Sequence, residues 1–141
     1  MANKLSQRLA DIVDALPLKE GVRVLEIGCG PGAAARQIAS RIRKGYVLGI
    51  DRSAKAIKLA IEGSQDEMAT GRLSFRQSAI EDFELSPGEE KYDLAFAVRV
   101  GALDGRHPET ERRATLQIKK VLKEDGRLFV DIGDTLKEVP L

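Results

Sequence analysis

The chain has 141 residues, the size of one domain, and folding at that length buries roughly 70% of the surface of the unfolded chain. Its composition is that of an ordinary globular protein, with 43% hydrophobic residues, 32% charged residues and no tryptophan. The net charge is +1, and the Lys and Arg residues are scattered among acids, which argues against a broad basic surface for nucleic acid.

Cys29 is the only cysteine, which excludes an internal disulfide and a cysteine-based metal cluster. We therefore expect no metal site and a reducing compartment. The opening residues, 1–13, form an amphipathic pattern without the apolar core of a signal sequence, and no run approaches membrane-spanning length. The sequence predicts a cytoplasmic protein that neither spans a membrane nor binds nucleic acid.

The first half of the chain alternates helical and strand-like segments. Apolar residues at helical spacing predict an opening helix that stops near Pro17. A strand over residues 21–28 follows, and then a helix with Pro31 in its first turn, ending near Gly45. Residues 46–51 form the second predicted strand.

The middle of the chain continues the alternation. Ser53 is placed to cap a third helix, and Gly63 is a stop signal for it. Residues 72–78 form the third predicted strand, and residues 80–91 an irregular crossover with a short helix. The fourth strand, residues 92–98, is apolar enough to be buried on both faces.

The last part supplies one more helix and one more strand. Pro108 suits a helix N-terminus, apolar residues at helical spacing follow it, and Gly126 turns the chain into a fifth strand over residues 127–133. Strands that alternate with helices predict a parallel sheet covered by helices on both faces. The fold class is therefore α/β.

The segment "VLEIGCGPG", residues 24–32, is the most informative stretch. Glycine has no side chain, so its backbone can approach a ligand closely, and the helix that follows offers free N–H groups. Asp51 ends the second strand nineteen residues beyond Gly32, where a carboxylate accepts hydrogen bonds from the hydroxyls of a ribose. A ribose-bearing ligand is therefore predicted, the alternative being a tight turn with a helix-capping aspartate.

The identity of the nucleoside stays open at this point. The letters "GCGPGA" match G-x-G-x-x-A, the dinucleotide-binding pattern, and Asp51 would suit NAD equally well. Glu26, however, would bring a negative charge close to the pyrophosphate of NAD. An acid at that place fits instead a compact ligand with an ammonium and a sulfonium group.

From about residue 20 to residue 132 the sequence resembles the class I S-adenosylmethionine-dependent methyltransferases. "VLEIGCGPG" is similar to the first motif of that family, and "GID" to its acidic ribose-binding position. "RLSFRQSAIEDF", "KYDLAFAV" and "LKEDGRLFVDI" resemble the segments around its third, fourth and fifth strands. The resemblance implies a Rossmann-like, doubly wound, mostly parallel sheet of order 3-2-1-4-5, with S-adenosyl-L-methionine as cofactor.

It also implies one methyltransferase-like domain over residues 1–141, with an N-terminal helix in 1–19, a Rossmann-like core in 20–132 and a short tail in 133–141. The implied cofactor-binding residues are Glu26, Gly28, Cys29, Gly30, Gly32, Asp51, Arg52, Ser78, Ala79, Ile80 and Val98. In this assignment Glu26 faces the methionine amino group, Asp51 binds the ribose hydroxyls, and Ala79 and Ile80 border the adenine with Glu81 near its amino group. Cys29 fills space inside the turn.

Three features depart from the family pattern. Ser78 stands where the family often has an aspartate, and no N-P-P-Y or D-P-P-Y follows the fourth strand. Only nine residues follow Ile132, too few for the usual C-terminal hairpin. Because proteins seldom leave a strand edge bare, we expect the fifth strand to be covered by the tail, by a homodimer or by a partner subunit.

The segment after the fourth strand, residues 98–109, is the predicted acceptor side. Arg99 and His107 are the catalytic candidates, with His107 as a base and Arg99 and Arg106 as a clamp for a carboxylate or phosphate. In the alternative interpretation His107 merely precedes the helix that starts at Pro108, and Asp104 belongs to a simple turn.

The favoured hypothesis is methyl transfer from S-adenosylmethionine to a small-molecule acceptor, which requires alignment and exclusion of water. A base is needed only if the acceptor must lose a proton. Two alternatives stay open. One is a non-catalytic cofactor-binding module or partial methyltransferase that needs a partner subunit, and the other is an NAD-dependent oxidoreductase.

Overall fold

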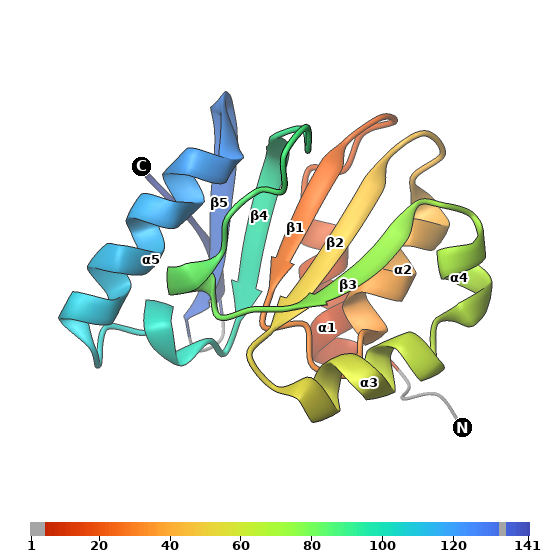
Figure 1. Cartoon of the computed structure of the whole chain (residues 1–141), viewed down its shortest axis with the longest axis horizontal. Helices are drawn as coiled ribbons and strands as arrows, with labels where there is room; N and C mark the ends of the chain where they lie inside the picture. The colour runs from red at the N-terminus through yellow and green to blue at the C-terminus, as the bar shows by residue number, and fades with distance from the viewer. Residues whose placement is uncertain (1–4, 133–134) are drawn as a thin grey trace.

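Six strands form one sheet in the order β3-β2-β1-β4-β5-β6, in a computed structural model that describes residues 5–132 and 135–141 (Figure 1). The strands are β1 (Arg23–Ile27), β2 (Tyr46–Asp51), β3 (Leu73–Gln77), β4 (Tyr92–Val98), β5 (Leu122–Ile132) and β6 (Thr135–Val139). The first five are parallel to one another, and β6 is antiparallel to β5. The α/β class and the predicted strand order 3-2-1-4-5 are therefore confirmed.

Helices connect the strands on both faces of the sheet. They are α1 (Gln7–Ala15), α2 (Ala33–Arg41), α3 (Ala54–Glu62), α4 (Gln65–Ala69) and α5 (Pro108–Val121), with the 3-10 turns η1 (Ile80–Asp82) and η2 (Gly101–Leu103). The hydroxyl of Ser53 accepts a hydrogen bond from Ala56 N, as the predicted cap requires. Helix α4 was not predicted, because none of its five residues is buried and no apolar periodicity marks it.

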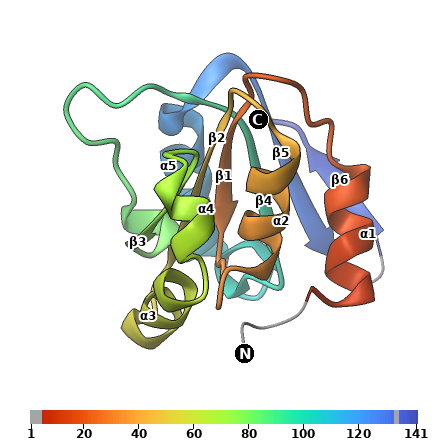
Figure 2. The same ribbon diagram turned by 90° about the vertical axis from the view of Figure 1, so that its right-hand side faces the viewer.

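Two apolar clusters lie on opposite faces of the sheet. On one face, α1 and α2 pack through Val13 and Ile38 against β1 and β4. On the other face, α5 and the crossover after β3 contribute Ile118 and Phe83. Figure 2 shows the sheet between these layers. The sheet, whose strands the sequence predicted to be buried on both faces, is therefore the middle layer of three, with helices on either side.

The C-terminal tail adds a strand to the sheet. Leu128 of β5 lies opposite Val139, and Ile132 lies opposite Thr135, so β6 covers the edge of β5. The sequence predicted a tail that is too short for two further strands. The tail contributes this single strand, and it covers β5 in one of the ways that we expected. Residues 1–4 and 133–134, which belong to the predicted N-terminal and tail regions, lie outside the described residues.

Helix α1 is attached to the sheet by an ion pair. Arg8 Nη2 donates to both carboxylate oxygens of Asp131, at 2.7 and 2.6 Å. The Asp131 side chain is only 2% exposed, although it lies near the end of β5. This contact joins two segments at opposite ends of the chain.

A stack of cationic and aromatic side chains lies at the amino ends of the strands. The guanidinium of Arg23 lies 4.8 Å from the ring centroids of both Tyr46 and Tyr92. The Tyr46 hydroxyl is also hydrogen-bonded to the hydroxyl of Ser74 on β3. The stack joins β1, β2 and β4 at the edge of the sheet opposite the predicted site.

Candidate functional site

The glycine turn between β1 and α2 lies at the carboxyl end of the sheet. Gly28, Gly30 and Gly32 have φ values of 73°, 53° and 88°, in the left-handed region that glycine adopts without strain. A Cβ added to Gly28 would lie 2.7 Å from Val100 Cγ2. At Gly30, no atom among the described residues lies within 4 Å of such a Cβ, so its backbone is open to a ligand.

Asp51, at the end of β2, is fixed against this turn. One carboxylate oxygen accepts a hydrogen bond from Gly30 N at 2.9 Å, and the other accepts from Ser53 N at 2.9 Å. These two hydrogen bonds fix the orientation of the half-buried carboxylate. It joins the two elements that sequence analysis predicted to act together.

Glu26 lies beneath the turn and is 3% exposed. Its Oε1 has no hydrogen-bond partner among the described residues. Burial raises the pKa of Glu26 to about 8, with a smaller contribution from Asp51, while a hydrogen bond from the Ala35 backbone and the charge of Arg36 oppose the shift. A buried, unpaired carboxyl oxygen suits a cationic group.

Arg36, on helix α2, contacts the turn and was not among the predicted site residues. This buried side chain donates from Nη1 to Pro31 O at 2.8 Å and to Ser64 Oγ at 2.9 Å. The contact with Ser64 depends on how α2 packs beside α4, so no local pattern distinguishes Arg36 from the exposed arginines nearby.

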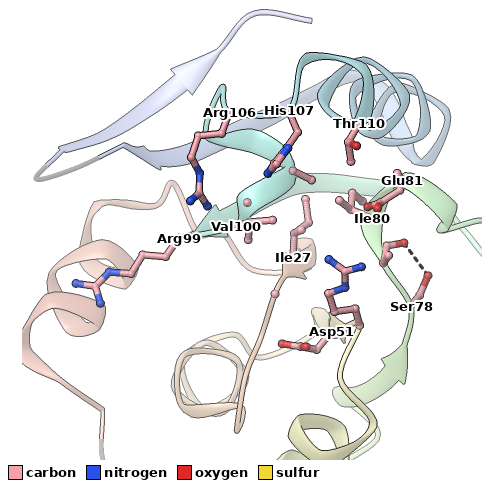
Figure 3. A pocket seen from close by; sticks show the side chains of 15 residues that line it. Ile27, Asp51, Ser78, Ile80, Glu81, Arg99, Val100, Arg106, His107 and Thr110 are labelled. Carbon is pink, nitrogen blue, oxygen red and sulfur yellow. Dashed lines mark hydrogen bonds between the residues drawn. The ribbon is translucent and has the colours of Figure 1, made fainter.

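A cavity of about 560 Å³ opens at the carboxyl ends of β1, β2, β3 and β4 (Figure 3). It lies on one side of the glycine turn, and its wall is formed by the strand ends, the crossover after β3 and the start of α5. The lining residues are Ile27, Gly28, Asp51, Arg52, Ser78, Ala79, Ile80, Glu81, Arg99, Val100, Gly101, Ala102, Arg106, His107 and Thr110.

The cavity brings together most, but not all, of the predicted site residues. Those that line it are Gly28, Asp51, Arg52, Ser78, Ala79, Ile80, Arg99 and His107. Those that do not line it are Glu26, Cys29, Gly30, Gly32 and Val98. Val98 packs against the apolar cluster on the α1 and α2 face. Thr110 and Ala102 also line the cavity but were not predicted from the sequence, because only the packing of α5 and η2 brings them there.

Two further small side chains near the turn are those of Ser78 and Cys29. The Ser78 hydroxyl donates to Ala79 O at 2.9 Å. Burial and the nearby Glu26 raise the pKa of the Cys29 thiol, so Cys29 stays protonated and is a poor nucleophile.

The segment between β4 and α5 bounds one side of the cavity. Arg99 has a φ of 56°, which is unusual for a residue other than glycine, and its side chain extends away from the other labelled residues (Figure 3). His107 is the N-cap of α5, makes no capping bond through its side chain, and points into the cavity. His107 therefore lies at the start of the helix, as the alternative interpretation expected, and its side chain also reaches the cavity.

Arg106 precedes His107 and is oriented by Asp104. Arg106 Nε donates to Asp104 Oδ2 at 2.7 Å, and Arg106 N donates to Asp104 Oδ1 at 3.0 Å. These hydrogen bonds, led by the one from Arg106 N, hold the pKa of Asp104 below its usual range. Within the described ranges, no three His, Cys, Asp or Glu side chains gather to hold a metal ion. Nor is any helix there long and apolar enough to cross a membrane.

The known proteins that this chain resembles in sequence and in structure include several methyltransferases. A family model described as "Methyltransferase domain" matches residues 18–140. The "Putative methyltransferase YrhH" of Bacillus subtilis is 27% identical over 128 residues, which cover 90% of this chain and 66% of that protein. The (S)-coclaurine N-methyltransferase of Papaver somniferum is 31% identical over 114 residues, which cover 81% of this chain and 30% of that enzyme.

Among solved structures, one similar fold is a SAM-dependent methyltransferase from Thiobacillus denitrificans in complex with S-adenosyl-L-homocysteine. It has a TM-score of 0.69 and 23% identity, and the match covers 92% of this chain and 50% of that one. The chain thus spans from about a third to about two thirds of the length of these relatives.

Proposed function

The chain belongs to the class I S-adenosylmethionine-dependent methyltransferases, and from this premise we propose that it transfers the methyl group to a small-molecule acceptor. The observation that supports this most is the cavity of about 560 Å³ between Asp51 and His107. Asp51 and the residues proposed for the adenine line one part of it, and the wall from Arg99 to Thr110 is the part proposed for a small acceptor. The similarity to a coclaurine N-methyltransferase supports the same class of acceptor.

The residues present fit S-adenosylmethionine, the cofactor of this family. The buried Oε1 of Glu26 lacks a partner and would accept a hydrogen bond from the methionine ammonium. The open space beside Gly30 would admit the ligand close to the backbone, and Asp51 would bind the ribose. Around them we propose Gly28, Cys29, Gly32 and Val98 beside the methionine part, and Arg52, Ser78, Ala79 and Ile80 beside the adenine.

When bound, S-adenosylmethionine supplies an activated methyl group on a sulfonium. In the proposal the wall from Arg99 to His107 holds the acceptor in line and excludes water. Arg99 turns the chain into this wall through its left-handed backbone. His107 would accept a proton where the acceptor must lose one.

Calorimetric titration with S-adenosylhomocysteine tests the cofactor assignment. We expect Asp51→Ala to weaken binding by about 1.5–3 kcal/mol, the range for hydrogen bonds to a charged group. Asp51→Asn should lose less, because its carbonyl oxygen can still accept a hydrogen bond from Gly30 N. His107→Ala and the exposed control Asp66→Ala should have little effect on this affinity.

Equal losses for Asp51→Ala and His107→Ala would mean that the site is misplaced. Binding of NADH without binding of S-adenosylhomocysteine would favour an oxidoreductase instead. Binding of S-adenosylhomocysteine, with no methyl transfer to any acceptor tried, would favour a binding module that needs a partner.

A further inference from the structure

We propose that the acceptor has an anionic group, a carboxylate or a phosphate, and that Arg106 binds it beside His107 at the α5 side of the cavity. This inference rests on the proposed function, because it names the substrate class of the same cavity. It depends on the orientation of Arg106, on the direction of the His107 ring and on the charges around both.

Arg106 is held so that one edge of its guanidinium is available. Its Nε is bonded to Asp104, whereas neither Nη has an acceptor among residues 5–132 and 135–141. Nη2 lies 3.6 Å from the position of a Cβ on Gly101, which itself lines the cavity. The two Nη groups therefore form a fork at the cavity wall, and this fork matches two oxygens of one carboxylate or phosphate.

His107 and the start of α5 add to the same side. The imidazole points into the cavity and is not used as a helix cap (Figure 3). Because Pro108 has no N–H, the first free amides of this 14-residue helix are those of Glu109 and Thr110. The positive end of the helix dipole favours an anion near these groups.

Of the four acidic side chains on or near this wall, three have partners within the described residues, and Glu81 lies at the adenine side. Asp51, at the far side of the cavity in Figure 3, accepts hydrogen bonds from two backbone amides. Glu109 is paired with Arg112 at 2.6 Å. Glu81 is in the lining next to Ile80, at the side where we propose the adenine. Asp104 is paired with Arg106, and this exposed pair is screened by water. In the lining, Arg52, Arg99 and Arg106 outnumber Asp51 and Glu81, so the cavity favours an anion over a cation.

The single histidine makes the test specific. In a chain without an affinity tag, His107 gives the only histidine resonance, which NMR can follow in the presence of saturating S-adenosylhomocysteine. We would titrate with malonate and with inorganic phosphate, and with malonamide as the neutral match to malonate. At least one anion should produce a saturable shift, and malonamide should produce none.

Arg106→Gln should weaken the binding of that anion about tenfold or more, because a charge-assisted bidentate contact is lost. Arg112→Gln, which removes an arginine of the same helix outside the cavity, is the matched control and should leave the anion affinity unchanged. Both variants should bind S-adenosylhomocysteine like the wild type, which shows that they fold.

A shift with malonate alone supports a carboxylate acceptor, and a shift with phosphate alone supports a phosphorylated one. The inference is overturned by a missing shift, by an equal effect of malonamide, or by unchanged anion binding in Arg106→Gln. If S-adenosylhomocysteine binds and the anions do not, only this inference fails. If S-adenosylhomocysteine does not bind, the proposed function fails with it.

Discussion

At the level of single residues, Glu26 affects both the stability of the fold and the proposed binding of the cofactor. The fold buries this carboxyl below the glycine turn and leaves one oxygen without a partner among the described residues. Its pKa of about 8 means that the proton is largely retained at neutral pH in the absence of a cation. A bound ammonium would favour the ionised form, so cofactor binding should release a proton there.

The same residue predicts how stability depends on pH. The folded chain binds the Glu26 proton more tightly than the unfolded chain does, so this contribution is fully present below about pH 4 and is lost as the pH rises through 8. Between pH 5 and pH 9 the free energy of unfolding of the wild type should fall by about 4 kcal/mol relative to that of Glu26→Gln, as measured by urea unfolding. The exposed control Glu20→Gln should follow the wild type. Parallel profiles for the wild type and Glu26→Gln would contradict the assignment.

At the level of elements, the attachment of α1 depends on Arg8 and Asp131. The carboxylate is almost fully buried, so its charge has to be compensated by a partner inside the fold. A further ion pair of this helix, between Asp14 and Arg41, is exposed on both sides. The two pairs therefore provide a comparison between a buried and an exposed contact of one helix.

We expect Arg8→Gln to lower the free energy of unfolding by about 3–5 kcal/mol, because it leaves a buried carboxylate without its guanidinium. Asp14→Asn should cost less than about 1 kcal/mol. The double variant Arg8→Met/Asp131→Leu should recover much of the loss, since no charge then remains buried. Chemical unfolding of the four proteins tests this, and equal losses for Arg8→Gln and Asp14→Asn would contradict it.

At the level of the whole molecule, β6 completes the sheet. Leu136 packs against the cluster on the α1 and α2 face, and Val139 packs against the cluster on the α5 face. Removal of residues 135–141 should therefore cost about 2–4 kcal/mol and expose the edge of β5 to pairing between chains. Thermal unfolding and size-exclusion chromatography should show a lower Tm and aggregation. Lys137→Ala, which keeps the strand, should behave like the wild type, and a truncated chain with the Tm of the wild type would contradict the prediction.

The parts of the fold that the sequence predicted are those with local signals. Strands β2 and β4 have the predicted bounds, because each is an apolar run between turn residues. The sequence "TLKEV" of β6 has no such signal, and its strand exists through pairing with β5. Likewise, the glycine turn and Asp51 were predicted because they act within one βαβ unit. The wall with Arg106 and Thr110 depends on where α5 packs.

The stack of Arg23 over the rings of Tyr46 and Tyr92 has a consequence for optical experiments. The chain has two tyrosines and no tryptophan, so its intrinsic ultraviolet fluorescence comes from this one stack. The stack lies at the amino ends of the strands, about the length of a strand from the cavity, or roughly 20 Å. Tyrosine emission will therefore follow the opening of the sheet and stay nearly silent when a ligand enters the cavity. Folding and binding can thus be measured separately in one unlabelled sample.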